Sequence, residues 1–489
     1  MRAQKFLGVI LASTMLASCG GGGGGGSTPP PTGGGGTVNP PPTSDSCSLS
    51  ARKEWVLAQL QEYYLYPNLI ATNVNPDEYG TLDAYISALL APAYAERVDK
   101  DGFTYVTSIE QEQAQIANAT YEDYGWRPTF RGSSLVILET FEGAPAYAQG
   151  GIDRGAEILR IGRSASNLTD PVTAYNNGVL IDLLFPDSDG EQVVVEFANP
   201  DYANPGNYLA ARQVTLSAAE YSLDPISPRY GVETFGNTGY INLRTFATEK
   251  ASDQLGAAFA TLRSAGVSKI VVDVRYNGGG LVSVAEYFGD LLSEGLNGEL
   301  FSETIYSAGV ERNYAITEAD RLEYFQSVSN QIQASQLAFV TTDRSASASE
   351  LLANAFPPYY GNDTALVGSN TFGKPVGQIA IDRDACDDRL RVIAFKTVNA
   401  DGVGDYIDGL ADTYPVTCTA SDNIMLPLGD SREDSIAKAL GYMTNGAAVC
   451  SPISASASKG ITTLSARDEI VLMPKNPTLG EQSLYGPLR

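Results

Sequence analysis

Strands and helices alternate along the chain from about residue 226 to residue 450, and this alternation constrains the fold most. Ile270–Val274 and Leu337–Val340 are short apolar runs with the length of buried strands. Each runs into a turn rich in small residues, and Leu255–Leu262 and Leu351–Phe356 have the apolar character of helices. Such alternation is typical of an α/β layer structure. The sequence therefore predicts an α/β core over 226–450.

The rest of the folded chain divides into segments of different character. Residues 45–118 carry apolar residues at three-to-four spacing, which predicts helices. Residues 119–225 change to short strands separated by Gly and Asp turns, which predicts a small β domain. Residues 451–489 form a tail, in which the apolar run Ile470–Met473 is compatible with docking on the core.

The first 44 residues predict export and attachment to a membrane. A basic start and a short apolar run give residues 1–18 the features of a secretory signal peptide. Leu16–Cys19 resembles a bacterial lipobox, which implies a lipid anchor on Cys19 and a place in the outer membrane of a Gram-negative cell, facing the periplasm. An ordinary signal peptide with an incidental cysteine is the alternative. Residues 19–44 are almost entirely Gly, Pro, Ser and Thr and predict a flexible tether.

Charge and histidine content exclude several classes of function. The chain has 32 Lys and Arg against 57 Asp and Glu, a formal charge of −25, which argues against nucleic acid or an anionic membrane surface as a partner. It has no histidine, which excludes Ser-His-Asp and Cys-His sites and imidazole-ligated metals. Neither a metal nor an organic cofactor is indicated. Any general base must be Lys, Asp, Glu, Tyr or a terminal amine.

Four further cysteines predict disulfides. Cys47, Cys386, Cys418 and Cys450 are far apart and lack the C-x-x-C spacing of zinc or redox sites. Outside the cytoplasm an even number favours two bridges, with three alternative pairings. A Cys47–Cys450 bridge is one hypothesis, because it would tie the two ends of the folded region together.

Three turns of the α/β region carry residues suited to one chemistry. Ser347 stands in a turn before a helix, Gly278–Gly280 form a turn after a strand, and Lys374 lies in an otherwise uncharged turn after another strand. Without histidine, a neutral lysine is the best base for a serine nucleophile. Lowering a lysine pKa from near 10.4 to about 7–8 takes roughly 4 kcal/mol, which burial among apolar groups can supply.

These turns resemble the motifs of the C-terminal processing peptidase (tail-specific protease) family. The resemblance rests on Asp273–Gly280, Ser345–Glu350, and Thr371–Lys374 followed by Gln378, and it extends over most of residues 50–445. It implies a crotonase/ClpP-like α/β core, an inserted or preceding PDZ-like β domain, and a Ser-Lys dyad often joined by a glutamine.

The family's site residues carry over by position. The resemblance implies Ser347, the middle serine of its string, as nucleophile and Lys374 as general base and later acid. Gln378 would orient the lysine. The oxyanion hole would use the backbone N–H groups of Ala348 and Gly279, the latter because relatives often have proline one position earlier, and proline has no N–H.

The segment Gly143–Gly162 resembles the PDZ pattern around a peptide groove. PDZ domains bind an extended C-terminal peptide as an added strand and hold its carboxylate with backbone N–H groups. The resemblance places the carboxylate loop at Gly132, Ser133, Ser134 and Leu135, and it implies protein substrates with free C-termini. The alternative is a small β domain with no ligand.

The leading hypothesis is a serine endopeptidase that captures protein C-termini and cleaves through an acyl-enzyme. The second is a non-catalytic PDZ-based adaptor lipoprotein in which the dyad residues are relics. A third, from the resemblance to crotonase-like domains, is a protein that binds apolar small molecules.

Overall fold

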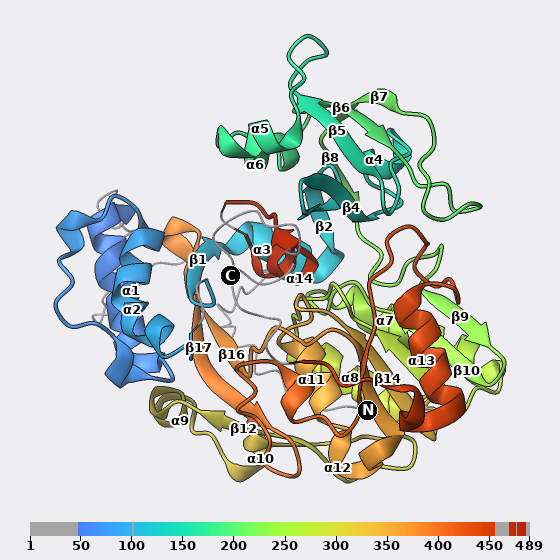
Figure 1. The fold of residues 1–489 in the computed structure, drawn as a ribbon. Helices are drawn as coiled ribbons and strands as arrows, with labels where there is room; N and C mark the ends of the chain where they lie inside the picture. Colours follow the sequence, from blue (N-terminus) through green and yellow to red (C-terminus); the bar gives the residue numbers. More distant parts are fainter. Residues whose placement is uncertain (1–46, 100–101, 455–468, 476, 486–489) are drawn as a thin grey trace, which may run out of the picture.

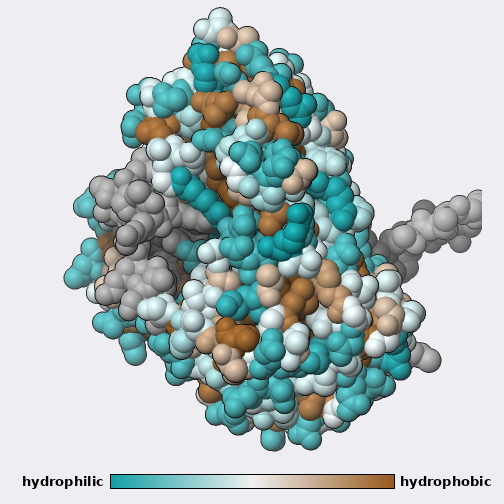
Figure 2. All heavy atoms as spheres, turned by 45° about the vertical axis from the view of Figure 1, so that its right-hand side comes forward, coloured by the Kyte–Doolittle hydropathy of each residue, from teal (hydrophilic) through white to brown (hydrophobic). Residues whose placement is uncertain are grey.

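The computed structural model describes residues 47–99, 102–454, 469–475 and 477–485 (Figure 1). The predicted signal peptide, Cys19 and the tether lie outside the described residues. Among the helices of the described part, none is both long and apolar enough to span a bilayer. On the face shown in Figure 2, apolar side chains are scattered among hydrophilic ones.

A six-stranded sheet, here called the core sheet, lies at the centre of the α/β region. Its order is β18-β15-β14-β11-β10-β9, and its neighbours are parallel except for β10 and β9. Its strands are β9 (Val232–Phe235), β10 (Thr238–Asn242), β11 (Lys269–Asp273), β14 (Gln336–Thr341), β15 (Thr364–Gly368) and β18 (Thr417–Thr419). Helices α7 (Lys250–Ser264), α8 (Val282–Leu292), α11 (Ala348–Asn354) and α13 (Asp434–Asn445) pack on it. The predicted α/β character is confirmed.

The sequence of β11 explains why both faces of this sheet are covered. Ile270 and Val272 belong to an apolar cluster with residues of α7, α8 and α11, whereas Val271 belongs to a second cluster with residues of α13. All three side chains are fully buried. Because alternate residues of a strand face opposite sides, an uninterrupted apolar run fits a strand between two helical layers.

The parallel order brings three loops to one edge of the core sheet. β11, β14 and β15 are neighbours, and the carboxyl ends of parallel neighbours lie at the same edge, where α/β proteins place their ligands. The turn Gly278–Gly280, called the glycine turn, follows β11, whereas Ser347 follows β14 and Lys374 follows β15. The topology therefore gathers the three predicted motifs.

Residues 119–225 and part of the tail form a second sheet, here called the middle sheet. Its order is β19-β3-β4-β5-β6-β7, with antiparallel neighbours throughout. Its strands are β3 (Trp126–Arg131), β4 (Ser134–Thr140), β5 (Glu157–Gly162), β6 (Gln192–Ala198), β7 (Arg212–Ser217) and β19 (Glu469–Val471), and its helices are α4 (Pro145–Ala148), α5 (Pro171–Asn176) and α6 (Leu180–Leu184). With its own apolar cluster it forms the upper lobe of Figure 1.

A third sheet, the composite sheet, joins the N-terminal region to the core. Its order is β1-β17-β12-β13, and β16 also pairs with β17. Its strands are β1 (Tyr105–Ser108), β12 (Leu300–Tyr306), β13 (Leu322–Tyr324), β16 (Val376–Arg383) and β17 (Asp388–Val398). Further elements are the pair β2 (Thr120–Asp123) and β8 (Ala219–Ser222), and helices α9 (Ala308–Tyr314), α10 (Glu318–Arg321), α12 (Pro357–Tyr360) and α14 (Leu479–Tyr485).

The helical prediction for residues 45–118 needs a correction. Helices α1 (Leu49–Tyr63), α2 (Leu82–Ala95) and α3 (Ile109–Asn118) form, but Tyr105–Ser108 is a strand paired with β17. This segment contains an aromatic and two β-branched residues, which favour strands. Its partner is remote in the sequence, so local periodicity does not reveal the pairing.

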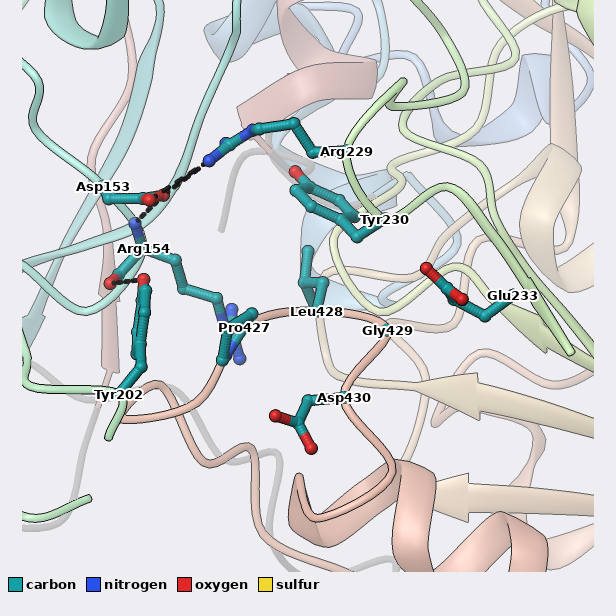
Figure 3. Close-up of a pocket in the computed structure, with 10 residues that line it drawn as sticks. All are labelled: Asp153, Arg154, Tyr202, Arg229, Tyr230, Glu233, Pro427, Leu428, Gly429 and Asp430. Carbon is teal, nitrogen blue, oxygen red and sulfur yellow. Dashed lines mark hydrogen bonds and ion pairs between the residues drawn. The ribbon is translucent and has the colours of Figure 1, made fainter. Parts of the chain in front are cut away.

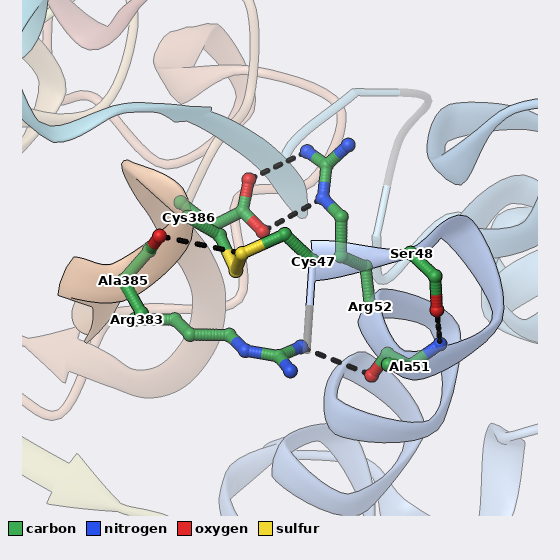
Figure 4. The surroundings of a disulfide bond; sticks show 8 residues. Cys47, Ser48, Ala51, Arg52, Arg383, Ala385 and Cys386 are labelled. Carbon is green, nitrogen blue, oxygen red and sulfur yellow. Dashed lines mark hydrogen bonds and ion pairs between the residues drawn. A yellow bond between two sulfur atoms is a disulfide. The ribbon is translucent and has the colours of Figure 1, made fainter. Parts of the chain in front are cut away.

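The four cysteines form two disulfides, but the pairing differs from the Cys47–Cys450 hypothesis, which is wrong. Cys47 bonds to Cys386, with Cα atoms 5.5 Å apart, and Cys418 bonds to Cys450. The first bridge attaches the start of α1 to the turn between β16 and β17 (Figure 4). Arg52 supports the same contact through hydrogen bonds of 2.7 and 2.5 Å to Asp388.

A buried charge network joins the upper lobe to the core. Arg154 donates to Asp422 Oδ1 at 2.6 Å and to Tyr276 Oη at 2.6 Å, and Arg275 donates to the same carboxylate at 3.0 Å. Burial opposes ionisation, yet these arginines hold the pKa of Asp422 well below its usual range. A cavity of about 350 Å³ opens beside Arg154 (Figure 3), and its lining includes none of the predicted site residues.

Non-reducing peptide mapping is expected to recover fragments linked as Cys47–Cys386 and Cys418–Cys450. Replacing Cys47 and Cys386 together by Ala is expected to lower the free energy of unfolding by about 2–4 kcal/mol, because the unfolded chain regains the entropy of a long loop. Urea unfolding without reductant measures this change. The double variant Cys418→Ala/Cys450→Ala, which lacks the other bridge, is measured beside it for comparison. A Cys47–Cys450 fragment, or unchanged stability, would contradict the bridge between α1 and the composite sheet.

Candidate active site

Ser347 stands at the start of α11 in a constrained conformation. Its φ of 54° and ψ of −113° lie outside the regions that non-glycine residues favour. Such a strained conformation persists only where surrounding contacts stabilise it. Its neighbours Ser345 and Ser349 are buried, and their hydroxyls donate to Val274 O and Asn277 O at 2.8 Å each. Ser347 is partly exposed. The two flanking hydroxyls are therefore engaged in holding the loop, whereas the side chain of the partly exposed Ser347 caps α11 by accepting from Glu350 N–H.

The glycine turn packs directly against this serine. A Cβ atom on Gly279 would lie 2.7 Å from Ser347 Cβ and 2.9 Å from Ala348 N, and the φ of Gly279 is 106°. No other residue fits here, because a side chain would clash and the backbone angle favours glycine.

The two predicted oxyanion donors differ in their hydrogen bonds. In the described part of the chain, Ala348 N–H, at the first position of α11, has no acceptor. Gly279 N–H donates to Asn277 Oδ1 at 2.9 Å. In this conformation Ala348 N–H is available to a substrate oxygen, and Gly279 N–H is not.

Lys374 places its amine in a buried site lined by Gln378 and Phe103. Its Nζ donates to Gln378 Oε1 at 3.2 Å, and Gln378 Nε2 donates to Phe103 O. The Phe103 ring covers the amine, with Nζ 4.3 Å from the ring centroid. Lys374 is only 5% exposed. The predicted neighbour Gln378 thus contacts the lysine amine.

Burial is the main reason that the pKa of Lys374 falls from 10.5 to about 8. The Asp99 carboxylate opposes this decrease, Arg391 adds to it, and Glu350 opposes it. Asp99 is itself buried, where it accepts hydrogen bonds from Tyr64 Oη at 2.9 Å and Thr104 Oγ1 at 3.0 Å. A substantial fraction of the amine is therefore neutral at mildly alkaline pH.

Glu350 links the loops that carry the serine and the lysine. Its buried carboxylate accepts a hydrogen bond from Ser347 N at 3.0 Å, and others from Gly373 N at 2.7 Å and Lys374 N at 2.8 Å. The bonds to Ser347 N and Lys374 N end on the same oxygen, so these two nitrogens are separated by less than the sum of the two lengths.

The side chains of Ser347 and Lys374 are not hydrogen-bonded to each other. Within residues 47–99 and 102–454, the lysine amine bonds to Gln378 Oε1 and not to Ser347 Oγ. Catalytic hydrogen bonds often tighten only when substrate binds. The structure therefore brings the two residues together without joining them.

Comparison with known proteins identifies this part of the chain. Residues 237–409, which include the glycine turn, Ser347, Lys374 and Gln378, match Peptidase family S41. These residues are a peptidase family S41 domain. The resemblance to the C-terminal processing peptidases is confirmed, and the S41 proteases of this group are serine-type peptidases.

Two curated relatives from Bacillus subtilis (strain 168) are similar. Carboxy-terminal processing protease CtpA is 24% identical over 303 residues, covering 61% of this chain and 57% of that protein. Carboxy-terminal processing protease CtpB is 24% identical over 325 residues, covering 66% and 60%. The alignments thus span less than two thirds of either relative.

A solved structure has a similar fold. The crystal structure of a Bacteroides fragilis NCTC 9343 protein assigned to the S41 proteases matches with a TM-score of 0.60 and 20% identity. The match covers 80% of this chain and 97% of that one. At this identity the likeness concerns the fold alone.

The predicted carboxylate loop is not found at Gly132–Leu135. Gly132 and Ser133 form the tight turn of the β3–β4 hairpin, and Ser134 Oγ donates to Glu157 Oε1 at 2.6 Å. Leu135 is fully buried and lies in β4, an interior strand that pairs with Phe130 on one side and Ile158 on the other. Because both edges of β4 are already paired, an added peptide strand finds no partner there. The outer edge of β3 pairs with β19 instead.

Sequence reasoning missed three residues beside the S41 domain's lysine. Glu350 belongs to the Ser345–Glu350 motif, but nothing in that motif indicates which groups its carboxylate binds. Asp99 and Phe103 lie in the N-terminal region, in Asp99–Thr107, a segment whose sequence also resembles the family; this likeness is the signal that could have found them. Their positions depend on the composite sheet, which sequence periodicity did not reveal.

Replacing Lys374 by Met is expected to stabilise the protein at pH 7. The folded pKa of about 8 lies below the unfolded 10.5, so the folded state disfavours the charged amine by about 3 kcal/mol. This penalty is full below pH 8 and disappears as the pH rises through 10.5. Urea unfolding should therefore show a gain for Lys374→Met at pH 7 that shrinks towards pH 10. A variant less stable than wild type at pH 7 would contradict a desolvated amine.

Proposed function

We propose that this chain is a serine endopeptidase in which Ser347 is the nucleophile and Lys374 the general base. The observation that carries the proposal is the buried Lys374 amine with its pKa of about 8. The backbone N–H groups of Lys374 and Ser347 both donate to the Glu350 carboxylate, which holds the two residues close together. A base near the working pH combines basicity with a useful neutral fraction. The chain has no histidine that could take this role.

The first half of the reaction forms an acyl-enzyme. Lys374 Nζ takes the proton of Ser347 Oγ as that oxygen attacks the carbonyl carbon of the substrate's peptide bond. The carbonyl oxygen becomes negatively charged, and Ala348 N–H stabilises it. Gly279 N–H joins as a second donor once it leaves Asn277 Oδ1. The protonated lysine then gives its proton to the departing amine, and the C–N bond breaks.

The second half releases the product. Lys374 takes a proton from a water molecule, whose oxygen attacks the ester carbonyl carbon of the acyl-enzyme. The ester bond breaks, Ser347 Oγ recovers its proton from the lysine, and the carboxyl product leaves. Gln378 Oε1 holds the amine by accepting a hydrogen bond, which supports its role in orienting the lysine.

We assign substrate capture to the middle sheet acting as a PDZ-like peptide-binding domain. The antiparallel pairing of β19 with β3 supports this assignment, because PDZ domains take peptides as added strands. The substrates are unfolded protein segments with free C-termini. The signal sequence and the lipobox at Cys19 support a lipid-anchored enzyme that faces the periplasm from the outer membrane.

Ser347→Ala and Lys374→Ala are each expected to reduce hydrolysis of an unfolded casein-like protein by at least about 10³-fold, because the members of a dyad act as a unit. Lys438→Ala, on the surface of α13, is the matched control and should keep full activity. A serine-reactive phosphonate should label Ser347 in wild type and not in Ser347→Ala. Full hydrolysis by either dyad variant would exclude the mechanism, and absence of both hydrolysis and labelling in wild type would favour the adaptor.

The pH dependence of kcat/KM should follow the ionisation of Lys374. Because the protonated amine cannot act as a base, kcat/KM is expected to rise about tenfold per pH unit below pH 8 and to level off above it. Initial rates between pH 5.5 and 10, at substrate concentrations well below KM, measure this profile. A profile that is flat from pH 6 to 9 would sink the assignment of Lys374 as base.

A further inference from the structure

The C-terminal helix α14 lies on the glycine turn. Gly278 N–H donates to Ser483 O at 2.8 Å, and Ser483 Oγ donates to Gly279 O at 2.5 Å. A Cβ atom on Gly278 would lie 2.3 Å from Gln482 O, so the absence of a side chain there permits the contact. The turn that packs against Ser347 on one side thus holds the chain's own tail on another.

The tail reaches this place by way of the middle sheet. Strand β19 adds to β3 with Glu469 opposite Arg131 and Val471 opposite Thr129, which is antiparallel strand addition. The chain then continues to α14, beside α3 (Figure 1), where Thr478 Oγ1 bonds to Gln115 Oε1. The tail therefore runs from the proposed peptide-binding edge to the proposed catalytic loop.

Arg344 connects these two ends. It lies three positions before Ser347, on the same loop, and is almost fully buried. Its Nη1 donates to Tyr485 O at 2.9 Å and its Nη2 donates to Thr129 Oγ1 of β3 at 2.8 Å. A guanidinium that binds a main-chain carbonyl reads no side chain, so it suits any peptide that follows this path.

Apolar side chains hold the tail in place. Leu484 is fully buried and Tyr485 is 2% exposed, and both belong to the apolar cluster of the middle sheet. The Tyr485 ring lies edge-on to Phe185, and its hydroxyl donates to Asp123 Oδ2 at 2.7 Å. Burying a leucine and a tyrosine contributes several kcal/mol. This docking energy must be overcome before another peptide can use the same surface.

We propose that residues 469–475 and 477–485 act as a tethered inhibitor that occupies the peptide path from β3 to the glycine turn, and that substrates must displace it. The inference rests on the proposed peptidase function and adds regulation of the same site. Ser483 O accepts from Gly278 N–H, next to the predicted oxyanion donor Gly279. Residues 479–485 are helical, so their peptide bonds are folded into a helix and not extended towards Ser347. The segment therefore occupies the path up to the glycine turn without being cut, while Ser347 itself stays partly exposed.

Ionisation of Glu481 makes the stability of tail docking depend on pH. Burial raises its pKa from 4.5 to about 7, a hydrogen bond from Thr478 N–H opposes the increase, and the nearby Asp123 adds to it. The other titratable groups facing it are the phenols of Tyr105, Tyr121 and Tyr485. Docking is therefore most stable below pH 4.5, weakens as the pH rises to about 7, and carries the full penalty of a buried charge above that value.

Full-length Leu484→Asp tests the proposal. A carboxylate cannot stay in the apolar cluster, so the tail should leave and kcat/KM for an unfolded protein should rise at least tenfold. A synthetic peptide of residues 469–485 should then inhibit this variant by raising KM with kcat unchanged, and a scrambled peptide should not inhibit. Lys438→Ala, on α13 and outside the tail, is the control and should behave as wild type. Unchanged or lower activity in a folded Leu484→Asp protein would overturn the proposal.

Two further measurements keep the test decisive. If Leu484→Asp fails to fold, Ser483→Ala removes the hydroxyl contacts to Gly279 and Thr245 and should raise kcat/KM by at least threefold; equal activity would overturn the inhibitor role. If wild type and variants all lack hydrolysis, the peptidase proposal fails while tail docking remains measurable. A fluorescein-labelled 469–485 peptide should bind Leu484→Asp at least tenfold more tightly than wild type by anisotropy, and equal binding would show that the tail does not occupy this path.

Discussion

The buried carboxylate of Glu350 is the contact on which the candidate site depends. It accepts amide hydrogen bonds from the loop after β14 and the loop after β15, so two neighbouring βα connections share one anchor. Hydrogen bonds to an ionised acceptor are about twice as strong as neutral ones, and here they offset part of the cost of burying the charge. They also hold Ser347 in its unfavourable backbone conformation. The same negative charge opposes deprotonation of Lys374. Burial and Arg391 lower the pKa of the lysine, and Glu350 and Asp99 raise it.

The site is assembled from more of the chain than the S41 domain. Phe103, which covers the lysine amine, and Asp99, which raises its pKa, come from the N-terminal region. The Cys47–Cys386 bridge attaches that region to the composite sheet. The Arg154–Asp422 network ties the upper lobe to the core, and the tail bridges both. The amine is therefore shielded from water only when the N-terminal region is docked on the core. This arrangement couples the chemistry of the lysine to the state of its neighbours.

The sequence predicted those parts of the molecule whose signals are local. The apolar runs and turns of the α/β region identified the strands that precede Ser347 and Lys374, and the spacing to Gln378 led to the residue that contacts the lysine amine. Long-range contacts could not be predicted in this way. The cysteine pairing, the strand Tyr105–Ser108 and the partners of Glu350 all depend on distances that the sequence does not contain. The tail illustrates the limit of prediction from local signals. Its apolar run suggested docking on the core. In the structure Leu472 and Met473 are buried in the cluster of the middle sheet, and α14 rests on the glycine turn.

The Lys374 amine loses its proton at a pH well below that of an ordinary lysine, so that a useful fraction is neutral where a serine must be activated. Carbon-13 NMR of protein labelled at lysine Cε, titrated from pH 6 to 12 and assigned by comparison with Lys374→Met, measures that ionisation directly. One resonance should titrate near pH 8, well before those of the other lysines, and should be absent from the variant. If the resonance lost in Lys374→Met titrates near 10.5, the amine is solvated and the account of this site is wrong.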